Sequence, residues 1–98
     1  MNIEYKTRKL ERICIFYYEA CKAYGNKMAE KISMRINELK SVQSVEEMMF
    51  YSIGRCHPLK ADRTGDYAMD LVQPYRLIFK KVDRKNDSIM ITRIEDYH

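Results

Sequence analysis

The apolar positions in the first half of the chain recur at steps of three and four residues. This spacing runs from Leu10 to Tyr24 and predicts an amphipathic helix, which Thr7 caps and Gly25 ends in a left-handed conformation. A second helix is predicted over residues 27–40, where the same spacing continues. Because few residues join the two helices, we expect them to pack as an antiparallel hairpin.

Shorter elements are predicted on both sides of this hairpin. Residues 1–5 alternate apolar and polar side chains, which is typical of a strand. Ser44 and Glu47 have the spacing of a capping box, which predicts a short third helix through Met49.

From about Ile53 the period changes from 3.6 to 2. Alternating segments at 67–72, 75–80 and 89–94 predict three strands of an antiparallel meander, with a polar turn at 83–87. A further short strand is predicted within 55–59. The expected fold is a single α+β domain over 1–98, with an N-terminal strand and a helix hairpin packed on an antiparallel sheet.

Composition excludes several classes of protein. The chain has 98 residues, of which 46% are hydrophobic, too many for a disordered chain. Its longest apolar run, 13–18, is far shorter than a membrane span, and the N-terminus has no apolar signal core. We therefore expect a small, soluble, intracellular domain. The net charge of +4 and eight tyrosines among eleven aromatic residues favour RNA or a protein partner. The alternative is that the tyrosines occupy half-buried positions of the domain itself and indicate no partner.

The cysteines predict neither a disulfide framework nor a zinc site, because there are three of them and no pair has C-x-x-C spacing. Cys14 and Cys21 are seven residues apart and should share a helix face in the core. Cys56 precedes His57, which suggests a thiolate nucleophile. A buried core thiol is the alternative, since no third group that would orient the pair is evident.

Residues 14–18 are consecutively apolar or aromatic, whereas a surface helix needs only one apolar stripe. Two explanations are open: the domain's own core covers them, or a partner protein covers some of them.

Arg76 is a charged residue inside an otherwise apolar predicted strand. Alternation places it on the same face as Lys80, with Ile78 between them. A solvated surface explains the basic residues of the following turn better than it explains Arg76.

The two histidines lie in segments rich in phosphate-binding and stacking side chains, 57–63 and 96–98. Cleavage of RNA by its own 2′-hydroxyl needs a base, an acid and positive charge on the phosphorane. Imidazole can be base or acid, and the Arg76 fork matches phosphate oxygens. Which histidine is the base stays open.

Four ordered motifs carry a family resemblance: G-R-C-H-P-L-K-A-D-R at 54–63, Y-A-M-D-L at 67–71, P-Y-R-L-I-F at 74–79 and I-E-D-Y-H at 94–98. Together they resemble the RelE superfamily of bacterial toxins, and most of all its HigB-type branch, whose members also end in Asp-Tyr-His. One departure is Ala61, where that family often has glycine.

The resemblance implies a type II toxin that cuts mRNA in the ribosomal A site without a metal or other cofactor. It also implies neutralisation by a helix-turn-helix, HigA-type antitoxin, and contact with operator DNA only through the complex. The residues that the resemblance implies as catalytic are His57, Arg76, Asp96, Tyr97 and His98, and it implies Lys60 as a residue that binds RNA. Arg63 and Lys80, basic residues of the same two segments as Lys60 and Arg76, are further candidates for binding RNA.

Two other functions stay open. The same fold serves ParE-type toxins, which act on DNA gyrase and need no RNA-cutting residues. A subunit that acts only within a repressor complex is the third possibility.

Overall fold

The computed structural model describes residues 1–82 and 87–97, and within them the predicted α+β class is confirmed. The helices are α1 (Arg8–Ile15), α2 (Tyr17–Tyr24), α3 (Asn26–Ser41) and α4 (Val45–Phe50). The strands are β1 (Asn2–Tyr5), β2 (His57–Pro58), β3 (Asp66–Asp70), β4 (Tyr75–Lys81) and β5 (Ser88–Asp96). Two 3-10 turns, η1 (Ile53–Arg55) and η2 (Ala61–Arg63), lie on either side of β2. None of the helices in the described ranges is long and apolar enough to cross a membrane.

The strands form one sheet in the order β1-β5-β4-β3-β2. β3, β4 and β5 are the predicted antiparallel meander, and β2 is the predicted short strand, paired antiparallel with β3. β1 pairs in parallel with β5 at the other edge, so the sheet is mixed. The polar turn predicted at 83–87 lies, apart from Asp87, outside the described residues.

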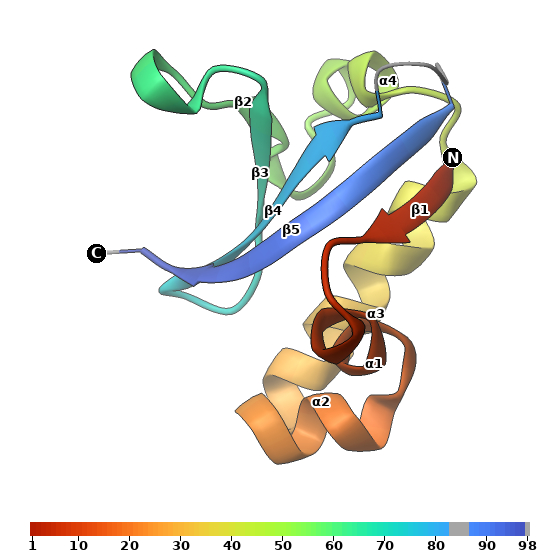
Figure 1. Cartoon of the computed structure of the whole chain (residues 1–98), viewed down its shortest axis with the longest axis vertical. Coiled ribbons are helices and arrows are strands. Elements are labelled where there is room, and N and C mark those ends of the chain that lie inside the picture. Colours follow the sequence, from red (N-terminus) through yellow and green to blue (C-terminus); the bar gives the residue numbers. More distant parts are fainter. Residues whose placement is uncertain (83–86, 98) are drawn as a thin grey trace.

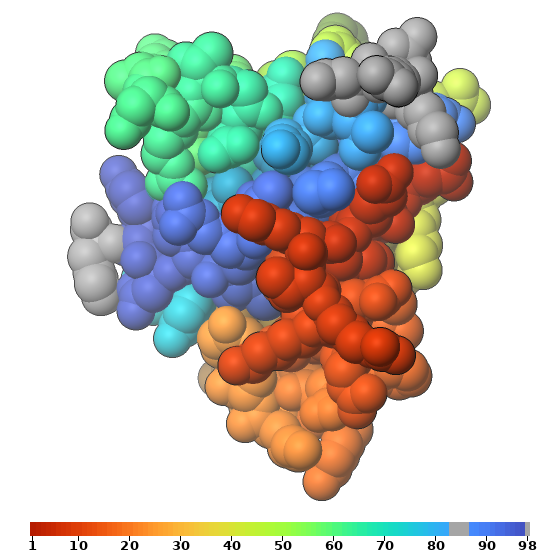
Figure 2. Space-filling view, viewed as in Figure 1, coloured from red at the N-terminus to blue at the C-terminus, as the bar shows by residue number. Residues whose placement is uncertain are grey.

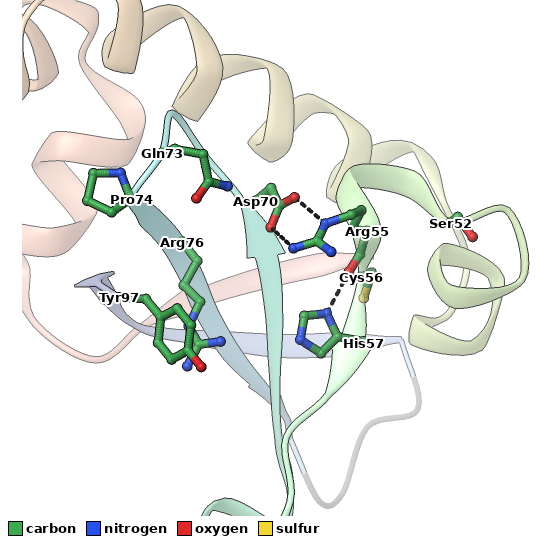
Figure 3. A pocket seen from close by; sticks show the side chains of 9 residues that line it. All are labelled: Ser52, Arg55, Cys56, His57, Asp70, Gln73, Pro74, Arg76 and Tyr97. Carbon is green, nitrogen blue, oxygen red and sulfur yellow. Dashed lines mark hydrogen bonds and ion pairs between the residues drawn. The ribbon is translucent and has the colours of Figure 1, made fainter.

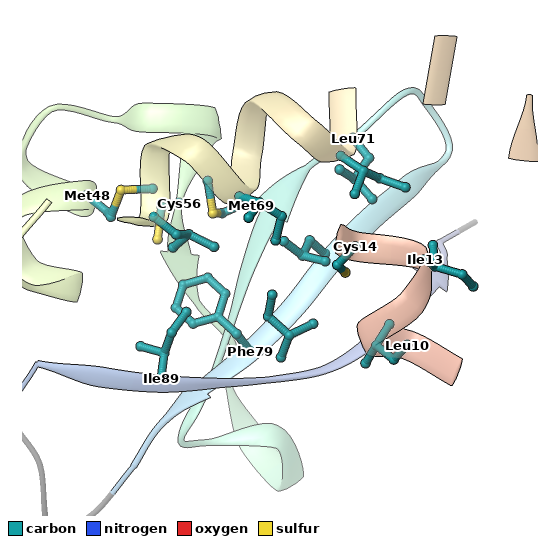
Figure 4. Close-up of a cluster of buried hydrophobic side chains, with 14 of the residues drawn as sticks. Leu10, Ile13, Cys14, Met48, Cys56, Met69, Leu71, Phe79 and Ile89 are labelled. Atoms are coloured by element: carbon teal, nitrogen blue, oxygen red, sulfur yellow. The ribbon is translucent and has the colours of Figure 1, made fainter. Parts of the chain in front are cut away.

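One face of the sheet carries the hydrophobic core (Figures 1 and 4). Leu77 and Phe79 of β4 point to this face, where fully buried side chains of α3 such as Ile32 and Leu39 meet them. The helices gather on this side, so the other face of β2–β5 has room for polar groups.

The helix predicted through Tyr24 is wrong in one respect, because the structure breaks it at Phe16. Phe16 has extended backbone angles (φ −103°, ψ 113°), and its N–H closes α1 on the carbonyl of Arg12. Aromatic and β-branched residues lose side-chain freedom in a helix, so a run of them is a favourable place for a break. The break lets α1 pack on the sheet while α2 packs along α3. Consequently Cys14 and Cys21 lie on different helices, Cys14 buried and Cys21 partly so.

The helix ends follow the predicted caps. The hydroxyl oxygens of Thr7 and Ser44 accept hydrogen bonds from the backbone N–H groups of Leu10 and Glu47, both at 3.1 Å. Gly25 alone joins α2 to α3 and has a positive φ, as predicted for the residue that ends the helix. Its ψ of 171° is extended, however, and not that of the left-handed helix region.

The break leaves four consecutive large side chains in contact with solvent. Ile15, Phe16 and Tyr17 are each about half exposed, and Tyr18 is 71% exposed. The domain's own core therefore does not cover them, although it does cover Cys14. We call residues 15–18 the α1–α2 patch.

Candidate active site

Strand register brings three of the predicted site residues, His57, Arg76 and Lys80, onto the face of the sheet opposite the helices. Directly paired residues point to the same face, so Arg76 shares its face with Asp70 of β3 and Glu95 of β5. The next row contains His57 of β2, paired with Ala68. Arg76 and Lys80 lie on one face with Ile78 between them, as predicted.

A cavity of about 510 Å³ opens on this face (Figure 3). Its walls come from the segment between α4 and β2 that contains η1, from β2, from the end of β3 and the β3–β4 turn, from β4 and from the residue after β5. The residues that line it are Ser52, Arg55, Cys56, His57, Asp70, Gln73, Pro74, Arg76 and Tyr97. Three predicted catalytic residues, His57, Arg76 and Tyr97, therefore line one cavity.

Glu95 holds Arg76 in place. Nε and Nη2 of Arg76 each lie 2.7 Å from one Glu95 oxygen, and both side chains are about 85% buried. Arg63 reaches the same carboxylate from η2 with contacts of 2.7 and 3.1 Å, and Arg93 lies 3.6 Å away. Arg63 and Arg76 lower the pKa of Glu95 against the opposing effect of burial. Three guanidinium groups around one carboxylate leave this part of the face positively charged.

Tyr97 lies over the Arg76 guanidinium, whose central carbon is 3.9 Å from the ring centre. The backbone N–H of Tyr97 donates a 2.9 Å hydrogen bond to the Pro74 carbonyl, which ties the residue after β5 to the start of β4. Figure 3 shows the ring stacked on the guanidinium at the mouth of the cavity. Arg76 is thus held by an ion pair at its edge and a ring on its face.

The tautomer of His57 follows from its hydrogen bond. Nδ1 lies 2.7 Å from the backbone carbonyl oxygen of Arg55, which can only accept. Nδ1 therefore carries the proton, and in the neutral ring Nε2 keeps its lone pair. The free nitrogen is the one with which the ring can accept a proton.

Of the other predicted site residues, those that the structure describes do not line the cavity. The guanidinium group of Arg63 is in the ion pair with Glu95 described above. Lys60 is exposed on the β2–β3 loop, and Lys80 borders a separate hollow beside Asp66. Asp96 is exposed at the end of β5, and His98 lies outside the described residues. Figure 2 shows the β2–β3 loop as a lobe next to the C-terminal end of β5.

Cys56 has the environment of a core thiol. Its side chain is buried in the hydrophobic cluster, and burial raises the pKa of the thiol to about 11. A thiol with such a pKa is almost entirely protonated near neutral pH, so it is a poor nucleophile. This favours the core interpretation of Cys56. Within the described ranges, no group of three or more His, Cys, Asp or Glu side chains is placed to hold a metal ion.

Three charged residues of the site were missed in the sequence. Asp70 interrupts the apolar segment 67–72, the same signal that singled out Arg76, whereas Glu95 lies in a polar part of β5 and carries no such signal. Both pair with Arg76 in the sheet. Arg55 lies in the first motif, yet its ion pair with Asp70 needs the β2–β3 pairing, which residue spacing alone does not give.

Comparison with solved structures identifies the fold. The chain superimposes over its whole length on a YoeB/ParE toxin from Agrobacterium tumefaciens, with a TM-score of 0.69, 17% identity and all of that chain covered. The chain has the fold of the YoeB and ParE toxins of the RelE superfamily.

Two further structures agree. A YoeB–YefM complex from Staphylococcus aureus matches with a TM-score of 0.64 and 23% identity, over all of this chain and 97% of that one. A heterotetrameric YoeB–YefM toxin–antitoxin complex from the same organism matches over the same shares, with a TM-score of 0.61 and 27% identity. Neither the scan against protein-family models nor the search of curated proteins gave a match.

Proposed function

We propose that this protein is the toxin of a type II toxin–antitoxin system and a ribosome-dependent, metal-independent mRNA endoribonuclease. The observation that carries the proposal is the cavity that His57, Arg76 and Tyr97 share. Its imidazole has a defined tautomer and its guanidinium a fixed position. They supply the base and the positive charge, two of the three groups that cleavage of RNA through its own 2′-hydroxyl requires.

The proposed reaction begins at the 2′-hydroxyl of the bound mRNA. Nε2 of His57 takes the hydroxyl proton while the oxygen forms a bond to the adjacent phosphorus. Arg76 stabilises the negative charge on the phosphorane oxygens, and the exposed outer part of the Tyr97 ring stacks on a base. The bond from phosphorus to the 5′-oxygen then breaks, which leaves a 2′,3′-cyclic phosphate and a 5′-hydroxyl.

The departing 5′-oxygen needs a proton from an acid. His98 is proposed for this role from its motif, with Asp96 beside it in sequence to orient an imidazole. Lys60, Arg63 and Lys80 are proposed to contact RNA phosphates around the cavity. Translated mRNA in the A site, hence in the cytoplasm, is the proposed substrate.

The proposed partner is a helix-turn-helix antitoxin of the HigA type, with the toxin itself in the HigB-type branch. The four motifs and the Asp-Tyr-His ending support that branch, and the complexes of the YoeB relatives support the existence of an antitoxin. The exposed α1–α2 patch offers it an apolar surface. Operator DNA is proposed to be bound only through the complex.

Primer extension on mRNA translated by purified ribosomes tests the proposed activity. We expect cuts with the wild-type protein, also when EDTA is present and a polyamine keeps the ribosomes intact. Arg76→Ala and His57→Gln should each abolish the cuts, while Arg12→Ala, an arginine in an exposed ion pair on α1, should not.

Two results would contradict the proposal. Inhibition of gyrase supercoiling without mRNA cleavage would favour the ParE-type alternative. Normal operator binding by the complex, with neither activity, would favour a subunit that serves only in repression.

A further inference from the structure

Arg55 has an unusual backbone conformation beside the proposed base. Its φ is 53°, in the left-handed region that side chains other than glycine rarely adopt. Ser52 and Gly54 also have positive φ, so the chain turns sharply between α4 and β2. This turn aims the Arg55 carbonyl at Nδ1 of His57.

Arg55 is also tied to the sheet through its side chain. Its guanidinium contacts both Asp70 carboxylate oxygens, at 2.5 and 3.2 Å, in a bidentate pair (Figure 3). A backbone hydrogen bond of 3.1 Å from the Arg55 N–H to the Ser52 carbonyl closes the same turn. Arg55 is therefore held through its side chain and through its backbone N–H in a conformation that is otherwise unfavourable.

Asp70 is fixed in turn from α3. The buried Arg35 donates a 2.6 Å hydrogen bond from Nε to the Asp70 backbone carbonyl, and its Nη1 pairs with Glu38 at 2.8 Å. Arg35 also packs under the turn, since a Cβ on Gly54 would lie 2.8 Å from its Nε. The contacts form a continuous series from α3 through Asp70 to Arg55.

We propose that Arg55 is a positioning residue: its ion pair with Asp70 holds the left-handed backbone whose carbonyl fixes His57 in the Nδ1–H tautomer. The catalytic part of this inference rests on the proposed nuclease function, whereas the tautomer does not. A histidine side chain in water favours the other tautomer, with the proton on Nε2. Without the carbonyl, Nε2 would thus most often carry the proton and be unable to accept another.

A direct role of Arg55 on RNA is the competing explanation, because its side chain is 73% exposed and lines the cavity. The two roles differ in what glycine does at this position. Glycine removes the guanidinium but adopts a positive φ without strain, and it keeps the carbonyl. Alanine removes the guanidinium and keeps the strain.

The experiment is ¹⁵N NMR of the imidazole nitrogens in the full chain, with His57 assigned by the loss of its signals in His57→Gln. We expect the Nδ1–H tautomer in the wild type and in Arg55→Gly. In Arg55→Ala we expect the Nε2–H tautomer to become the major form. Arg12→Ala removes a guanidinium from a distant ion pair and should leave the spectrum unchanged.

If Arg55→Ala does not fold, Asp70→Asn replaces it in the NMR experiment. It keeps an oxygen for Arg55 and the backbone carbonyl for Arg35, but removes the charge, and should raise the Nε2–H fraction. The proposal is overturned if the wild type has the Nε2–H form, if the folded Arg55→Ala or Asp70→Asn keeps the wild-type spectrum, or if Arg55→Gly loses the Nδ1–H form as fully as Arg55→Ala.

Cleavage kinetics connect the tautomer to activity. Arg55→Ala should lower kcat about tenfold with little change in KM, and Arg55→Gly should recover most of it. Equal increases in KM for both variants, with kcat unchanged, would instead indicate direct RNA binding and overturn the catalytic part. If no variant and no wild-type protein cuts mRNA, the proposed function fails, and the tautomer result stands by itself.

Discussion

The guanidinium carbon of Arg76 lies 3.9 Å from the centre of the Tyr97 ring, while Glu95 holds the edge of the same guanidinium. Arginine is suited to this place because its group is flat, so a ring can stack on it while its N–H groups form paired hydrogen bonds. Lysine has the same charge but neither property.

Arg76→Lys should therefore lower mRNA cleavage by about 10²-fold or more, since a point charge replaces a positioned fork on the phosphorane. The loss should appear in kcat, measured by single-turnover cleavage on ribosomes. Arg93→Lys is the matched control, because Arg93 also faces Glu95 but at 3.6 Å and largely exposed. Equal losses in the two variants would mean that only the summed charge matters.

Glu95→Gln should change how stability depends on pH. The folded-state pKa of Glu95 lies below its ordinary value of 4.5, so the charged carboxylate stabilises the fold fully above pH 4.5. This stabilisation should disappear as the pH falls below 4.5 and through the lowered folded-state value. Urea unfolding between pH 7 and pH 3 should show a smaller acid-induced loss in Glu95→Gln than in the wild type. Identical pH profiles would show that the arginines around Glu95 do not stabilise its charge.

Ala61→Gly should stabilise the protein. Ala61 has a φ of 60°, which costs alanine about 1–2 kcal/mol, more than the added chain entropy of glycine. We expect a net gain of about 0.5–1 kcal/mol in the free energy of unfolding, measured with urea. Ala23→Gly, at an exposed position of α2, should lose about 1 kcal/mol. Losses in both variants would show that Ala61 does not adopt this conformation in solution.

The double substitution Phe16→Ser and Tyr18→Ser should weaken binding of the proposed antitoxin by tenfold or more while cleavage is kept. Both side chains lie in the α1–α2 patch, away from the cavity, so their loss removes apolar contact area and nothing from the site. Calorimetry with the proposed helix-turn-helix antitoxin measures this. Phe50→Ser with Tyr51→Ser removes two exposed rings elsewhere on the surface, and this variant should bind normally.

Alkylation should distinguish the three cysteines. Burial raises the pKa of Cys56 to about 11 and that of Cys14 to about 12, so neither forms an appreciable thiolate at pH 8. Cys21 is only partly buried. Iodoacetamide at pH 8 should therefore modify Cys21 first, as mass spectrometry of peptides will show. Fast modification of Cys56, with loss of cleavage, would reopen the thiolate hypothesis.

Most of the helices and strands of this protein can be predicted from its sequence, since all but one of the predicted elements match the structure in type and place. Caps, periodicity and turn residues are local, so the bounds of α3, α4 and the meander strands could be predicted closely. Local signals, a histidine in a loop motif and a charge within an apolar strand, also predict His57 and Arg76 as candidate site residues. The break at Phe16 was missed, because it depends on what α1 and α2 each pack against.

Only the tertiary structure decided which groups meet. Glu95 reaches Arg76 through strand register, and Asp70 reaches Arg55 through the pairing of β2 with β3. The tautomer of His57 follows from a carbonyl only two residues away, but the ion pair that we propose to hold this carbonyl in place joins Arg55 to Asp70, 15 residues along the chain. Residue spacing indicates which face of the sheet a side chain is on, but not which side chain lies beside it on the neighbouring strand. In this site such neighbours decide where the guanidinium of Arg76 is held.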